Sequence, residues 1–198
     1  MKNALHSRRV VALLTLFATI PALAHTQTGV AGGLLSGLLH PVIGVDHLVA
    51  MVAVGLWGAI LGAPAIWVLP VTFPIVMALG ALAGVAGLPL PGVELAIAAS
   101  ALALGVAVVT RSRPPLWLAA VIVGLFAVFH GHAHGAEIPE ATNPLAYGVG
   151  FVLATGLLHL LGILIGLLVR WPTGLLVVRA CGAMIAAIGA WFLAGAVA

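Results

Sequence analysis

The chain has 198 residues, of which 64% are hydrophobic and only 6% are charged. A water-soluble domain of this composition would aggregate, so the composition predicts a protein whose solvent is the lipid bilayer. The formal net charge of +3 comes from too few charged residues to indicate a nucleic-acid partner. The single cysteine, Cys181, lies in the last apolar run and excludes an internal disulfide or a cysteine-rich metal site. We interpret it as small apolar filler.

Residues 1–24 have the pattern of a secretory signal peptide. A basic start with Lys2, Arg8 and Arg9 precedes an apolar centre, and Ala22-Leu23-Ala24 has the small residues of a cleavage site. We therefore expect residues 25–198 to form one transmembrane domain that begins at His25. The alternative is that this segment is retained as an anchoring helix, although its apolar centre is short for a span of about 20 residues.

Six apolar runs follow, separated by Pro, Gly or Arg residues: 30–62, 64–87, 92–110, 114–134, 143–169 and 173–197. They predict an all-α membrane protein, a bundle of six transmembrane helices. The first run is too long for one simple helix and contains Pro41, which should kink or break it. We expect a short helix to about His40, an interruption near Pro41, and a second helix from Asp46 to Gly62.

Two residue types suggest how these spans pack and where they end. Small-residue pairs at four-residue spacing let helices approach closely in lipid, and they occur at Gly33/Gly37, Gly58/Gly62, Gly80/Gly84, Gly131/Gly135 and Gly162/Gly166. The tryptophans mostly fall near span ends and predict an interfacial belt; they are Trp57, Trp67, Trp117, Trp171 and Trp191.

The charged residues predict the orientation. With the mature N-terminus in the periplasm, all of the arginines outside the signal become cytoplasmic, as the positive-inside rule requires: Arg111, Arg113, Arg170 and Arg179. The glutamates then fall at periplasmic ends: Glu94, Glu137 and Glu140. We expect a multi-pass protein of the bacterial inner membrane with both termini in the periplasm.

The first histidine motif is His40-Pro41-Val42-Ile43-Gly44-Val45-Asp46-His47, with Met51 one turn further on. Ionisable groups inside a bilayer cost several kcal/mol unless they are paired or solvated, so they indicate function by default. Imidazole nitrogens, a carboxylate and the free carbonyls of a broken helix suit Ni²⁺, Co²⁺ or Zn²⁺. The alternative is structural: His40 caps the break, and Asp46 pairs with His47 to hold two helices together.

The second motif is Phe129-His130-Gly131-His132-Ala133-His134-Gly135-Ala136-Glu137, at the predicted periplasmic end of the fourth span. His130 and His134 are one turn apart and can point together, whereas His132 points elsewhere if the helix continues. Glu137 and Glu140 would concentrate cations at this mouth. Solvated polar sequence without a ligand role is the alternative.

Three further polar residues are weaker candidates. His159, near the middle of the fifth span, is either a hydrogen-bonded packing residue or a ligand or proton partner at membrane depth. His25 could chelate a metal together with a free α-amine if cleavage occurs before it. Glu94 is either a carboxylate at the mouth or an interfacial residue.

Rival classes of function find little support in the motifs. An intramembrane serine protease needs Gly-x-Ser-Gly, which Gly33-Leu34-Leu35-Ser36-Gly37 misses by one position, and the His-Glu-x-x-His of a zinc protease is absent from the sequence. We expect no enzyme and no permanently bound cofactor. A membrane-anchored metal chaperone or sensor without transport stays open as an alternative.

Together the two motifs, with His159 and His25, resemble the HupE/UreJ family of hydrogenase and urease accessory proteins. The resemblance covers essentially the whole mature chain. It implies an inner-membrane permease for nickel, sometimes cobalt, that supplies metal for the maturation of nickel enzymes. The metal-site residues that it implies are His40, Asp46, His47, His130, His134, Glu137 and His159, with His132 at a variable position. The expected partners are the transported ion and the bilayer; the oligomeric state is left open.

Overall fold

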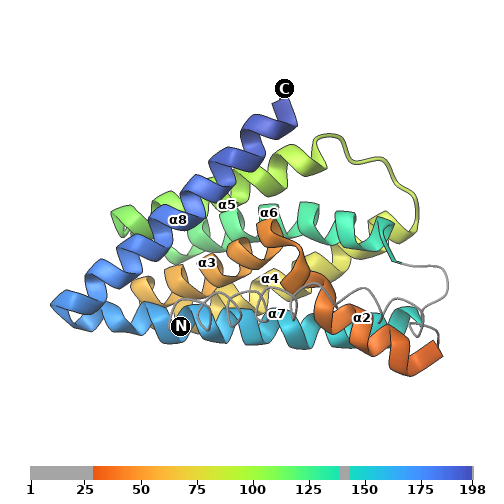
Figure 1. Ribbon diagram of the computed structural model, residues 1–198, viewed down its shortest axis with the longest axis horizontal. Helices are drawn as coiled ribbons and strands as arrows, with labels where there is room; N and C mark the ends of the chain where they lie inside the picture. The colour runs from red at the N-terminus through yellow and green to blue at the C-terminus, as the bar shows by residue number, and fades with distance from the viewer. Residues whose placement is uncertain (1–28, 139–142, 198) are drawn as a thin grey trace, which may run out of the picture.

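The structure, a computed structural model, describes residues 29–138 and 143–197, and every regular element in these ranges is helical (Figure 1). The predicted signal peptide, His25 and Glu140 lie outside the described residues. The elements are α2 Gly29–Ile43, α3 Val45–Leu61, α4 Ala65–Val85, α5 Val93–Thr110, α6 Leu116–Ala136, α7 Pro144–Gly166, the 3₁₀ turn η2 Leu167–Arg170 and α8 Pro172–Val197.

The helices α4 to α8 are each long and apolar enough to cross a membrane. The helices α2 and α3 meet this condition only as a pair, and they are bent by 80° at the break between them. The described residues thus contain five spanning helices, or six if the bent pair is one span. The chain is a multi-pass membrane protein, and the six predicted spans agree with the larger count.

The break in the first span lies at Gly44, three positions beyond the predicted one. Pro41 is buried inside the last turn of α2, where it removes a single helical N–H, and the turn still closes with Gly44 N–H donating to the His40 carbonyl at 3.2 Å. Gly44 then takes an extended conformation, with φ −72° and ψ 99°, and α3 starts in a new direction. The bend therefore comes at the residue that leaves the helical region, and the proline only weakens the turn before it.

The packing partners run in the directions that alternate membrane crossings require. On α7, Gly37 of α2 faces Tyr147 and Gly55 of α3 faces His159, so both halves of the broken span run in the same sense as α7. Contacts of Gly131 with Met77 and of Gly135 with Ala81 make α6 parallel to α4. The helix α8 crosses the bundle against α5 and runs antiparallel to it (Figure 1).

Most of the predicted glycine pairs lie at these helix contacts. A Cβ at Gly80, Gly84, Gly131 or Gly135 would collide with the backbone of the facing helix, and the same holds for Gly33, Gly37 and Gly162 on the α2/α7 and α3/α7 contacts. Gly58/Gly62 is the exception: Gly62 ends α3 with φ +81°, and a Cβ there would meet nothing within 4 Å. This glycine serves a turn that needs the left-handed region.

Overpacking the α4/α6 contact should destabilise the bundle. Gly131→Ala places its Cβ against the Met77 carbonyl oxygen, and we expect a loss of about 1–3 kcal/mol in stability. Gly124→Ala in the same helix is the matched control, because its Cβ would make only ordinary 3.8 Å contacts with Thr72 and Val76. Thermal unfolding in detergent measures the difference, and equal unfolding temperatures would contradict the packing argument.

The four arginines lie at one end of the bundle, where α3, α5 and α7 finish. Arg179 donates from Nε to the Val109 carbonyl at 3.2 Å, which brings the start of α8 to the end of α5. Trp57 lies at the same end, but it is only 2% exposed and donates its indole N–H to the Ser112 carbonyl at 2.9 Å. Its assignment to an interfacial belt was wrong, because this hydrogen bond and its burial make it a core residue; the other four tryptophans are exposed on the outside of the bundle.

Candidate metal centre

Four histidines from three helices gather at the end of the bundle opposite the arginines. We call this group the histidine cluster: His40 of α2, His47 of α3, and His130 and His134 of α6. The ring centroid of His134 lies 4.8 Å from that of His40 and 4.3 Å from that of His47, and His47 lies 5.0 Å from His130. The two histidine motifs, which lie in different spans, therefore build one site.

A carboxylate lies at the outer edge of this cluster. Glu137 follows the last turn of α6, is exposed, and brings Oε2 to 3.5 Å from His40 Nε2. One donor atom each from His40, His134 and Glu137 lie within 4.8 Å of one another. These three residues are arranged so that a small inward movement would let one cation contact all of them.

The Asp46–His47 pair sets the orientation of the His47 ring. Asp46 Oδ1 accepts from the His47 backbone N–H and also lies 2.9 Å from His47 Nδ1. A carboxylate can only accept, so Nδ1 carries the proton and the lone pair lies on Nε2. Gly44 leaves room for this pair, since a Cβ there would lie 3.3 Å from His47 Nδ1 and 3.4 Å from Asp46 Oδ1. The contact makes Asp46 a positioning group for His47.

The same logic assigns the lone pair of His130. Its Nδ1 lies 2.9 Å from the Phe126 carbonyl one turn earlier in α6, and a carbonyl accepts only, so Nδ1 donates. His130 Nε2 is buried without a hydrogen-bond partner, as are His47 Nε2 and both ring nitrogens of His134. Buried polar atoms are normally hydrogen-bonded, so several unpartnered nitrogens in one group are available together to bind a ligand. Imidazole nitrogens with a single carboxylate suit a divalent transition metal.

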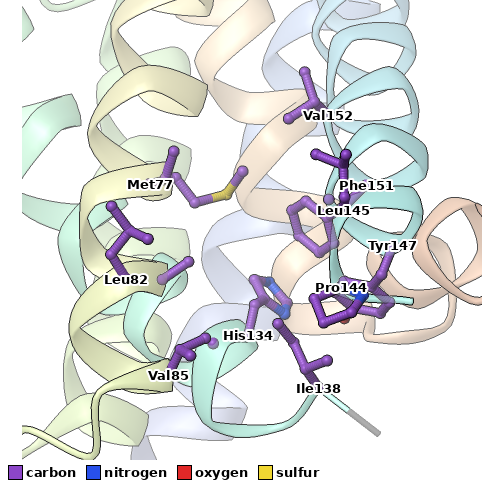
Figure 2. Close-up of a pocket in the computed structure, with 14 residues that line it drawn as sticks. Met77, Leu82, Val85, His134, Ile138, Pro144, Leu145, Tyr147, Phe151 and Val152 are labelled. Carbon is purple, nitrogen blue, oxygen red and sulfur yellow. The ribbon is translucent and has the colours of Figure 1, made fainter. Parts of the chain in front are cut away.

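On its other side His134 faces an apolar cavity of about 400 Å³ between α4, α6 and α7. Figure 2 shows its imidazole between Met77, Leu82 and Val85 on one side and residues of α7, including Tyr147 and Phe151, on the other. The Phe151 ring packs 4.2 Å from the His134 ring, centroid to centroid. This wall offers His134 almost no polar atom, so neither ring nitrogen finds a hydrogen-bond partner there.

His159, the remaining predicted ligand, lies deeper in the bundle. It is 1% exposed on α7, and its ring packs against Phe73 at a centroid distance of 5.5 Å. Phe73 also contacts His130, at 5.4 Å. His159 is thus linked to the histidine cluster through an aromatic side chain and is not in ring contact with its members.

Other polar residues lie around the site without joining it. His132 points away, as predicted, with Nε2 2.7 Å from the Leu88 carbonyl. Glu94 is exposed and lines one pocket together with Asp46 and with Trp191 and Phe192 of α8.

Sequence reasoning missed the aromatic wall of the site. Tyr147 is 3% exposed, its hydroxyl has no hydrogen-bond partner, and its ring lies 5.8 Å from that of His40. It is the single tyrosine of the chain, one turn into a span, and that rarity was the signal available. Phe73 and Phe151 gave no comparable signal, because phenylalanine is ordinary in an apolar span.

The fold and the site define a class: helical membrane proteins in which histidines from several helices gather inside the bundle, with carboxylates beside them. The model of the family described as HupE / UreJ protein matches residues 12–192. "Protein HupE" of Rhizobium leguminosarum bv. viciae is similar to this chain, with 45% identity over 177 residues, which are 89% of this chain and 93% of that protein. The chain belongs to the HupE / UreJ family. No solved structure matches it.

Proposed function

We propose that this protein is an inner-membrane permease for a divalent transition metal, nickel first and cobalt second, that supplies metal for hydrogenase or urease maturation. The observation that carries the proposal is the histidine cluster, in which His47, His130 and His134 have buried ring nitrogens without a hydrogen-bond partner. Such groups are costly in a bilayer unless they serve an ion pathway. Membership of the HupE / UreJ family and the resemblance of its motifs favour nickel.

The arrangement suggests an order of contacts for the ion. Glu137 is exposed and negative, so it attracts a hydrated cation to His40 and His134. The ion then exchanges water for imidazole nitrogens, because His47 and His130 lie next to His134 with Nε2 free. Asp46 keeps His47 in the ligating tautomer and adds negative charge behind it.

The donor set argues for selectivity against the common hard cations. Ca²⁺ and Mg²⁺ prefer several oxygen ligands, whereas this site presents four imidazoles and one adjacent carboxylate. A thiolate, which would favour Cu⁺, is absent from the site because Cys181 lies in α8. The site needs no resident cofactor, and we propose no enzymatic activity for it.

The charge distribution supports an orientation for transport. The arginines at one end would face the cytoplasm, which places the histidine cluster and Glu137 on the periplasmic side with both termini. A metal ion would then be captured from the periplasm. The N-terminal signal peptide proposed from the sequence fits this orientation.

Metal flux into vesicles tests the permease directly. Purified protein is reconstituted into metal-free vesicles, and the uptake of radioactive nickel is followed over time. A permease gives uptake that continues until the gradient is dissipated. A metal-binding chaperone or sensor saturates at an amount of nickel stoichiometric with protein, and that result would replace the permease by the alternative.

Uptake should also depend on pH. Imidazole binds metal only when it is neutral, and its reference pKa is about 6.5, so uptake should fall as the external pH drops below about 6. Initial rates of nickel uptake at constant membrane potential measure this dependence. Equal rates between about pH 7 and 5 would count against ligation by histidine.

A further inference from the structure

Two polar side chains that the histidine cluster does not use lie on one face in the middle of α7. Thr155 and His159 are one helical turn apart, so they lie on the same face. Their exposed fractions are 0% and 1%. Neither Thr155 Oγ1 nor either ring nitrogen of His159 has a hydrogen-bond partner.

The missing partners are unusual for both residue types. A threonine inside a helix commonly donates to the carbonyl four residues earlier, and Thr155 makes no such bond. A buried hydroxyl without a partner loses the hydrogen bonds that it would make to water, and the same holds for a buried imidazole. Two such groups on one face indicate a place that a polar species occupies.

A backbone carbonyl supplies a third donor at this place. The helix α4 contains both Pro70 and Pro74, and because Pro74 has no N–H, the Pro70 carbonyl lacks its partner four residues ahead. That carbonyl lies close to the His159 ring, although not in hydrogen-bond geometry. Free carbonyls of interrupted helices are common cation ligands in transporters.

The place is connected to the histidine cluster through Phe73, which precedes Pro74. Phe73 is fully buried, and its ring contacts both the His130 ring and the His159 ring. An ion that leaves the histidine cluster past this ring would next meet Thr155 and His159.

We propose that Thr155, His159 and the Pro70 carbonyl form a second, inner metal site, distinct from the histidine cluster, where the transported ion pauses before release. The proposal rests on the permease function above. Its donors are all neutral, since neither α4 nor α7 contains an acidic residue. The inner site therefore binds a cation more weakly than the histidine cluster does, where Glu137 and Asp46 contribute negative charge. Weak binding suits release, because conduction requires sites that an ion can leave.

A thiolate probe tests the site without relying on transport. Thr155→Cys, made in a Cys181→Ala background, puts a thiol in place of the hydroxyl and removes the γ-methyl group, and Co²⁺ bound by a thiolate gives a charge-transfer absorption band. We expect this band with Thr155→Cys and no band with Leu160→Cys, whose side chain is exposed on the outside of α7. Absence of the band in a folded Thr155→Cys protein that still binds Co²⁺ at the histidine cluster would overturn the inner site.

Flux provides the second readout. Thr155→Val exchanges the hydroxyl for a methyl group of similar size, and we expect vesicle uptake to fall about tenfold while the nickel affinity of the histidine cluster is unchanged. Thr155→Ser keeps the hydroxyl and should transport like the native protein. If Thr155→Val takes up nickel as fast as Thr155→Ser and the native chain, the inner site is contradicted but the permease function is not. Lack of uptake by the native chain would contradict the permease, while the Co²⁺ band would still report on the inner site.

Discussion

His134→Ala is expected to lower the affinity for nickel by more than about 100-fold and to abolish uptake. His134 contacts both His40 and His47 and shares the compact donor group with Glu137, so its loss separates the two halves of the site. Loss of a group that only orients a ligand typically costs about 10- to 100-fold, and loss of the central ligand should exceed that. Competition between purified protein and a chelator of known affinity measures the change.

His132→Ala is the control for this experiment. His132 lies two positions earlier in α6 but points to the Leu88 carbonyl, away from the histidine cluster. We expect its nickel affinity and uptake to match those of the native chain. Equal losses for His132→Ala and His134→Ala would mean that general damage to α6, and not ligation, explains the effect.

Asp46→Asn should reduce nickel affinity by about 10- to 100-fold, because Asp46 acts on the metal through His47. An asparagine oxygen can still accept from His47 Nδ1, so the ring keeps its orientation but loses the negative charge behind it. Asp46→Ala removes the acceptor as well and should cost more. Chelator competition measures the nickel affinity of the three purified chains, which should decrease in the order native, Asp46→Asn, Asp46→Ala.

That graded order distinguishes a positioning role from direct ligation. If the carboxylate itself bound the ion, both substitutions would remove the ligand and lower the affinity alike. Thermal unfolding of each chain in detergent, without metal, shows whether the fold is intact. A loss of affinity that follows a loss of fold would contradict the role proposed for Asp46.

Much of the bundle could be predicted because hydrocarbon imposes a simple rule on the chain. Long apolar runs between Pro, Gly and Arg residues gave the spans to within about two residues at most ends, and the glycine pairs gave most of the helix contacts. The position of the break in the first span was harder to predict from the sequence. Pro41 marks a weak turn, but the bend needs a residue that becomes extended, and only the structure shows that this is Gly44.

The site was predictable as a set of residues but not as a geometry. His40, His47, His130 and His134 were recognised from their cost in a membrane, yet nothing in the spacing joins the first span to the fourth. That joining depends on the 80° bend and on the contact of α2 and α3 with α7, which are tertiary features. Trp57 and Tyr147 show the same limit, since burial of a single aromatic residue depends on neighbours distant in sequence.

X-ray absorption at the nickel edge tests the central claim most directly, because it reports the ligands of the bound ion whether or not transport occurs. The purified native chain loaded with one equivalent of nickel should give a coordination shell of nitrogen and oxygen with the outer scattering of several imidazoles, and His134→Ala should lose part of that scattering. A nickel ion surrounded only by water oxygens, or a spectrum that His134→Ala leaves unchanged, would contradict a metal centre built from the histidine cluster.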